Sequence, residues 1–286
     1  MALSDDSFSG DDDYAAVGVT LPLDFMEDVA PREFAARRAI LSVVPAADRH
    51  TVEQLLSLFV LRTDKYDSSP LHLAVSDIEA FGDTRLEVCQ ALLTAGADPN
   101  DGSRKQSPLH LATERGDDEA VRMLIDAGLD PPADQEKTDT HRCTPLLRAC
   151  DTGHETVART LIDAGANTDA RECTLQSTPI HVAATKGHVG VVLALLQHGV
   201  LHNISLHNAT DRHGQSPLYV AAGNDVFLEE HEAVVRALID VGADANQRTH
   251  AGSTPLHGAA YYGHASVVKS YTLHPTPRTL HPTSRA

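Results

Sequence analysis

The stretch TPLLRACDTGHETVARTLIDAG, residues 144–165, is typical of two short helices joined by a turn. Thr144 can cap the first helix through its hydroxyl, and Pro145 at the first helical position gives up an N–H that has no partner there. The apolar block from Val157 to Ala164 has helical spacing, and Gly165 accepts the left-handed conformation that ends a helix. The stretch therefore predicts a unit of helix, turn, helix and glycine cap, followed by a polar loop.

The same phrase returns along the chain at a nearly constant interval, which is the signature of a repeat protein. The pattern Ser/Thr-Pro-Leu/Ile-x occurs six times, with separations of 38, 37, 34, 38 and 38 residues between its prolines. An alanine stands four positions after each proline, where it keeps the helix thin enough for neighbouring repeats to approach closely. The prolines are Pro70, Pro108, Pro145, Pro179, Pro217 and Pro255, and the alanines are Ala74, Ala112, Ala149, Ala183, Ala221 and Ala259. The period predicts an all-α stack of helix pairs.

The phrases Thr254-Pro255-Leu256-His257, Gly187-His188 and Gly242-Ala243-Asp244-Ala245-Asn246 resemble the ankyrin repeat. The resemblance covers about residues 65–270. It implies two antiparallel helices per repeat and a hairpin-like loop, with the tetrapeptide histidine hydrogen-bonding within and between repeats. We therefore expect an all-α ankyrin-repeat solenoid at 64–270, with about six repeats that start near 68, 106, 143, 177, 215 and 253.

Departures from the repeat predict where the stack is altered. Insertions at 76–85 and 223–232 are expected to lengthen the turn between the two helices, and one at 200–212 to lengthen the loop after the second helix. Leu147 and Tyr219 replace the usual histidine, so we expect weaker polar ties in the third and fifth repeats.

The two ends also depart from the repeat. Residues 32–63 read as a degenerate N-terminal capping repeat, and residues 1–31 are too acidic and too poor in apolar residues to fold alone. Near the other end, a seven-residue tandem copy at 272–285 replaces the expected continuation of the sixth repeat. We expect disorder in residues 1–31 and in an irregular tail at 271–286, and we interpret the break as an alternative splice form, a truncated gene model or a natural loss of the terminal cap.

The charge balance limits the partners. The chain has 23 Lys and Arg against 40 Asp and Glu, a net charge of −17, which would repel a phosphate backbone or an anionic membrane. Ser9 lies beside an acidic run and resembles an acid-directed kinase site, so it is a candidate for phosphorylation. The four cysteines are irregularly spaced, and neither a secretory signal nor a membrane-spanning run is visible. We expect an intracellular monomer, cytoplasmic rather than nuclear, that inserts in no membrane and binds no nucleic acid.

The sequence assembles no recognisable catalytic or metal site. The histidines fall mainly in the tetrapeptides and the Gly-His turns, and His198, His202 and His207 lack an established ligand spacing. Cys89 and Cys150 read as small buried apolar side chains, and no activating base for a nucleophile is identifiable. We expect no enzymatic activity, no cofactor and no metal ion.

The resemblance places binding in a groove lined by the loop tips and by the exposed ends of the first helices. The loop-tip candidates carried over from the family are Arg104, Gln106, His141, Cys143, Leu175, Ser177, Arg212, His213 and Gln215. The helix-end candidates are Glu114, Arg115, Asp151, Thr152, Thr185, Lys186, Asn224, Tyr261 and Tyr262. The two tyrosines would be the best anchor, because large aromatic side chains dominate interface energetics.

The function implied by the resemblance is that of a scaffold or adaptor for protein–protein interaction, which docks a partner protein in this groove. The alternative is a regulatory or substrate-recognition array of a larger enzyme or ubiquitin-ligase adaptor. Against an acidic mean, Arg104, Arg115, Lys186 and Arg212 would make the groove mixed in charge. The sequence therefore leaves the sign of the partner's charge open.

Overall fold

The computed structural model describes residues 70–76, 85–94, 106–127, 143–225 and 229–273, and the chain divides into two compact units, Met1–Asp98 and Pro99–Ala286. In the first unit the described residues form two helices that pack on each other, α3 (Pro70–Ser76) and α5 (Arg85–Thr94). The expected acidic segment at 1–31 and capping repeat at 32–63 lie outside the described residues.

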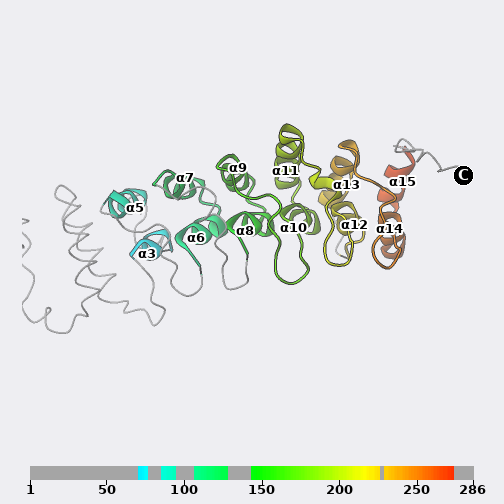
Figure 1. Cartoon of the computed structure of the whole chain (residues 1–286), viewed down its shortest axis with the longest axis horizontal. Coiled ribbons are helices and arrows are strands. Elements are labelled where there is room, and N and C mark those ends of the chain that lie inside the picture. Colours follow the sequence, from blue (N-terminus) through cyan, green and yellow to red (C-terminus); the bar gives the residue numbers. More distant parts are fainter. Residues whose placement is uncertain (1–69, 77–84, 95–105, 128–142, 226–228, 274–286) are drawn as a thin grey trace, which may run out of the picture. The chain divides into compact units, whose positions relative to one another are not determined.

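The second unit is built of helix pairs. The pairs are α6 (Pro108–Arg115) with α7 (Asp118–Asp126), α8 (Pro145–Thr152) with α9 (Glu155–Asp163), α10 (Pro179–Lys186) with α11 (Val189–His202), α12 (Pro217–Ala222) with α13 (Glu229–Asp240), and α14 (Pro255–Tyr262) with α15 (Ala265–Leu273). Successive first helices contact one another, and so do successive second helices (Figure 1). We call α6, α8, α10, α12 and α14 the first row and their partners the second row. This arrangement confirms the predicted all-α solenoid.

Three loops leave the first row on the side away from the second row (Figure 1). They connect α9 to α10, α11 to α12 and α13 to α14, and we call their segments 171–177, 210–215 and 247–253 the loop tips. Each loop is closed by a backbone hydrogen bond: Glu172 N–H to Ser177 O at 3.1 Å, Asp211 N–H to Gln215 O at 3.1 Å and Thr249 N–H to Ser253 O at 2.9 Å. These closures make the loops hairpin-like, as the resemblance implied.

The residue before the proline caps three first-row helices, α6, α8 and α12, as predicted. The side-chain oxygens of Ser107, Thr144 and Ser216 each accept the backbone N–H of the residue three positions on, at 3.2–3.4 Å. At the other end of α8, Gly153 has φ of 81°, a left-handed conformation that costs a residue with a Cβ free energy. Serine or threonine therefore starts these helices, and glycine ends α8.

The alanines four positions after the prolines are fully buried in the core. Ala74, Ala112, Ala149, Ala183, Ala221 and Ala259 are all 0% exposed. Because α10 contacts both α8 and α12, a larger side chain at Ala183 would have to push neighbouring helices apart. The packing supports the predicted reason for alanine at this position.

The structure tests two of the three predicted insertions, because most of the one at 76–85 lies outside the described residues. Six residues separate α12 from α13, whereas Gly153 and His154 alone separate α8 from α9, but 229–232 of the predicted insertion already belong to α13. The predicted loop at 200–212 is wrong in its first part, because α11 continues to His202 and a short 3₁₀ helix, η3 (Leu206–Asn208), follows.

Packing explains the extension of α11. Asn203 ends the helix in the left-handed conformation, with φ of 56°, and the N–H of Ile204 bonds to the carbonyl of Gly199 at 2.8 Å. A Cβ on Gly199 would lie 2.8 Å from the carbonyl oxygen of Ile204, so this glycine permits the close return of the chain. Val200 and Leu201 lie in this last turn of α11 and are 72% and 81% exposed.

The last helix, α15, includes residues 271–273, so it runs three residues past the tail boundary drawn from the sequence. The remainder of the expected tail lies outside the described residues. Among the helices that the structure describes, none has both the length and the apolar character needed to cross a bilayer.

Candidate protein-binding surface

In α6 and α10 the tetrapeptide histidine joins the first-row helix to the next loop. The Nδ1 of His181 lies 2.8 Å from Thr178 Oγ1 and 3.3 Å from the Thr178 backbone nitrogen, and its Nε2 lies 3.0 Å from the carbonyl oxygen of Gln215. The carbonyl requires a proton on Nε2, and the backbone N–H requires a lone pair on Nδ1, so the neutral ring satisfies both sides. His110 makes the same contacts with Ser107 and with Cys143 O. The implied role of this histidine is confirmed.

A second set of histidines ties the second-row helices α9, α11, α13 and α15 to the preceding repeat. The Nε2 atoms of His154 and His188 donate to the carbonyl oxygens of Glu114 at 3.1 Å and of Asp151 at 3.2 Å. The ring of His188 packs directly over Gly153, where a Cβ would lie 2.6 Å from it. Histidine and glycine in these turns therefore fit each other across repeats.

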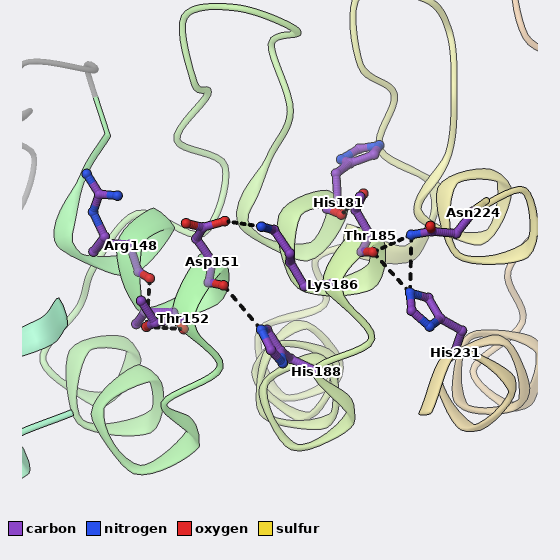
Figure 2. A network of polar contacts seen from close by, with 10 residues as sticks. Arg148, Asp151, Thr152, His181, Thr185, Lys186, His188, Asn224 and His231 are labelled. Atoms are coloured by element: carbon purple, nitrogen blue, oxygen red, sulfur yellow. Dashed lines mark hydrogen bonds and ion pairs between the residues drawn. The ribbon is translucent and has the colours of Figure 1, made fainter. Parts of the chain in front are cut away.

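His231 performs this task where the turn is lengthened, and the sequence reasoning missed it. Gly223 is followed by Asn224 and an insertion, yet His231 of α13 is 3% exposed and its Nε2 donates to Thr185 O at 3.0 Å (Figure 2). The amide of Asn224 donates to the same carbonyl. The available signal was its spacing, because His231 stands three residues before Val234, as His154 and His188 stand before Val157 and Val191.

These ties hold the backbone at the ends of the first-row helices and leave most of the side chains there at the surface. Lys186 Nζ on α10 pairs with the carboxylate of Asp151 on the adjacent first-row helix α8, at 3.1 Å (Figure 2). The hydroxyls of Thr152 and Thr185 donate to the carbonyls of Arg148 and His181 within their own helices. The result is a row of polar side chains on a backbone that the second-row histidines hold in place.

The loop tips are tied to one another as well. The Arg212 N–H donates to Leu175 O at 2.8 Å, and the Arg212 Nη1 donates to Thr174 O at 2.7 Å. The N–H of His250, in the third loop tip, donates to the carbonyl oxygen of His213, in the second loop tip, at 2.9 Å. The three described loops therefore form one continuous edge.

The structure locates most of the candidates on this surface. The exposed ones are Glu114, Arg115, Leu175, Thr185, Lys186, Arg212, His213, Tyr261 and Tyr262, and the half-buried ones are Gln106, Cys143, Asp151, Thr152, Gln215 and Asn224. Ser177 is buried, while Ser9, Arg104 and His141 lie outside the described residues. Tyr261 and Tyr262 are 83% and 46% exposed, with ring centroids 5.0 Å apart in an edge-to-face arrangement.

His198, His202 and Cys150, which the sequence raised as candidates for metal binding or catalysis, lie in the described part of the chain. His198 and His202 have ring centroids 4.3 Å apart on α11, but no group of three or more potential metal ligands occurs among the described residues. Burial, with a smaller contribution from the charge of Asp151, raises the pKa of the Cys150 thiol far above its ordinary value. Cys150 is a buried, protonated side chain, as its pattern predicted.

We expect the stability that His181 provides to be lost on acidification. Burial lowers the pKa of His181, so the unfolded chain binds protons at a higher pH than the folded chain does. The contribution is complete above the ordinary histidine pKa of about 6.5 and falls as the pH drops through the lower folded value. In thermal melts from about pH 7.5 to about pH 5, the advantage of the wild type over His181→Leu should shrink. The exposed control is His213→Leu. This role would be contradicted if the difference in melting temperature between the wild type and His181→Leu stayed constant with pH, or if the difference between the wild type and the control shrank equally.

Stacked helix pairs whose main contacts are with the neighbouring pairs define the class of helical repeat proteins. The chain belongs to the ankyrin-repeat family: the family model "Ankyrin repeats (3 copies)" matches residues 78–172, 167–249 and 201–271. Ankyrin repeats are generally modules for protein–protein interaction, and the family is generally non-enzymatic.

Several curated proteins are similar to this chain. The B-cell lymphoma 3 protein homolog of Mus musculus is 29% identical over 212 residues, which are 72% of this chain and 44% of that protein. Ankyrin repeat and SOCS box protein 16 of Mus musculus is 32% identical over 207 residues, 72% of this chain and 43% of that protein. Transient receptor potential cation channel subfamily A member 1 of Homo sapiens is 34% identical over 94 residues, 33% of this chain and 8% of that protein. The chain spans less than half the length of these relatives.

Proposed function

We propose that this chain is a scaffold or adaptor that binds a partner protein along the loop tips and the ends of the first-row helices. The observation that carries the proposal is the set of histidine ties from His154, His188 and His231 to backbone carbonyls. They fix the backbone under a row of exposed side chains, and a pre-organised surface loses less conformational entropy when it binds. Tyr261 and Tyr262 are the proposed aromatic anchors, because tyrosine is enriched among residues that dominate binding energy.

The test compares proteins captured from the native cell by three forms of the chain. The surface variant replaces Arg104, Arg115, Tyr261 and Tyr262 with alanine. The control replaces four second-row residues with alanine, the exposed Arg122, Leu193 and Arg236 and the half-buried Arg159. Mass spectrometry should find proteins bound by the wild type and the control but lost from the surface variant. Retention of the same partners by the surface variant would refute the assignment of the surface.

The second candidate is a substrate-recognition array of a larger ubiquitin-ligase adaptor. It is favoured by the similarity to Ankyrin repeat and SOCS box protein 16, of which the chain spans 43%. Reading the transcript past the codon for Ser270 distinguishes this candidate function from the first one. A reading frame that completes the repeat and continues into a further domain would favour this candidate.

A further inference from the structure

The loop tips gather basic side chains on one edge of an otherwise acidic chain. Each tip exposes one arginine, Arg171, Arg212 or Arg248, while the whole chain has a net charge of −17. His213 and His250 are exposed beside two of them. We infer that this edge binds an acidic segment of the partner protein, an inference that rests on the proposed function and adds the partner's charge to it.

The arginines are held in place by the loops themselves. The Arg171 Nη1 donates to Gln176 O at 2.9 Å and to Thr210 O of the next loop at 2.8 Å. Arg212 reaches back to the preceding loop through the contacts described above, and the Arg248 Nη1 donates to Gly252 O at 3.0 Å. Each of the side-chain contacts uses Nη1, so the other nitrogens of the guanidinium group are available for a ligand.

The acidic residues of the loop tips are occupied inside their own loops. The tips contain only two of them, Glu172 and Asp211. The Glu172 carboxylate accepts the Leu175 N–H at 2.7 Å. Asp211 is 6% exposed and accepts the N–H groups of His213 and Gln215, both at 2.8 Å. The negative charges therefore serve the loop backbone, and the positive charges face outward.

The second row shows how arginines behave in this chain when they are neutralised. Arg122, Arg159 and Arg236 each pair with an acidic residue one helical turn earlier, at 2.6, 2.9 and 3.0 Å. Among the described residues, none of the three tip arginines has a carboxylate partner within 4.0 Å. The tips thus differ from the second row in uncompensated charge, not in arginine content.

Carboxylates fit this edge better than phosphates do. Arginine recognises both through bidentate hydrogen bonds, but the large negative charge of the chain repels a long phosphate backbone, whereas a short acidic segment meets only the local tips. Neighbouring helices pack about 8–10 Å apart, and a chain in the polyproline II conformation advances about 3.1 Å per residue with three residues per turn. A segment in this conformation with an acid at every third position would therefore present its acids on one side and meet about one arginine per repeat.

The test is fluorescence anisotropy of a labelled peptide, Glu-Gly-Ser repeated four times, with the full chain at about 50 mM salt, where surface charges are weakly screened. The tip variant carries Arg171→Gln, Arg212→Gln and Arg248→Gln. The control carries Arg122→Gln, Arg159→Gln and Arg236→Gln, which changes the net charge equally. We expect binding by the wild type, about tenfold or greater weakening in the tip variant and less than about twofold in the control.

Two comparisons distinguish the loss of a specific site from loss of folding and from a change in net charge alone. A triple Arg→Lys variant at the tips keeps the charge and should bind the peptide within about fivefold of the wild type. The matched Gln-Gly-Ser peptide should not bind. Any of four results would overturn the inference. The control variant could lose as much peptide affinity as the tip variant, the glutamine peptide could bind as well as the glutamate peptide, or the wild type could bind neither peptide. The fourth is a single-stranded oligonucleotide that binds more tightly than the peptide and depends on the tip arginines. Partner capture that depends on Tyr261 and Tyr262 but not on the tip arginines would leave the proposed function standing and remove this inference alone.

Discussion

Replacement of Gly153 by alanine lowers the free energy of unfolding by about 2–5 kcal/mol, the sum of two effects. The residue has φ of 81°, where a Cβ costs about 1–2 kcal/mol. The new Cβ would also lie 2.6 Å from the ring of His188, and wedging the helices apart costs about 1–3 kcal/mol more. Chemical denaturation with far-ultraviolet circular dichroism measures the loss.

The chain offers a matched control for this variant. Gly165 has φ of 90° but no atom within 4 Å of its ideal Cβ, so Gly165→Ala should cost only the backbone part. Adding His188→Ala to Gly153→Ala removes the clash, and the pair should be less destabilised than the two single losses summed. Equal losses at Gly153 and Gly165 would show that His188 does not pack as described.

Replacement of Ala183 by leucine has the next largest expected effect, a loss of about 1–3 kcal/mol. The alanine is 0% exposed on α10, which contacts first-row helices on both sides. Extra side-chain atoms must displace α8 or α12, because an interior this close-packed has no space to receive them. Thermal and chemical denaturation should both report the loss.

Val182, its half-buried neighbour on the same helix, supplies the comparison. Val182→Leu adds volume outside the closest contact and should change stability by less than about 0.5 kcal/mol. If Ala183→Leu were as stable as the wild type, alanine would not set the distance between repeats.

The parts of the fold that were predictable from sequence follow local rules. Caps such as Ser107 and the glycine after α8 follow from the conformation of a few consecutive residues, and the buried alanines follow from their fixed place in the repeat. The extension of α11 was missed because its end is decided by Asn203 and by the close return of the chain over Gly199. The role of His231 was missed for a similar reason, since an insertion separates it from the glycine that normally marks the turn.

The candidate surface was predictable in position but not in chemistry. Family positions carried over by spacing identified Arg212, Thr185 and the tyrosines, and the structure brings the first two onto neighbouring elements of repeats four and five. The charge of the surface depends on which groups are already paired. Lys186 pairs with Asp151 and Asp211 turns into its own loop, and no linear pattern reveals either contact.

The measurement that tests the account most directly is hydrogen–deuterium exchange of the chain with and without a partner obtained by capture. We predict slower exchange in the loop tips, 171–177, 210–215 and 247–253, and at the ends of the first-row helices. Second-row helices α7, α9, α11 and α13 should exchange as they do in the free chain. Protection confined to the second row, with the loop tips unchanged, would contradict the claim that this protein binds through its loops and first-row helix ends.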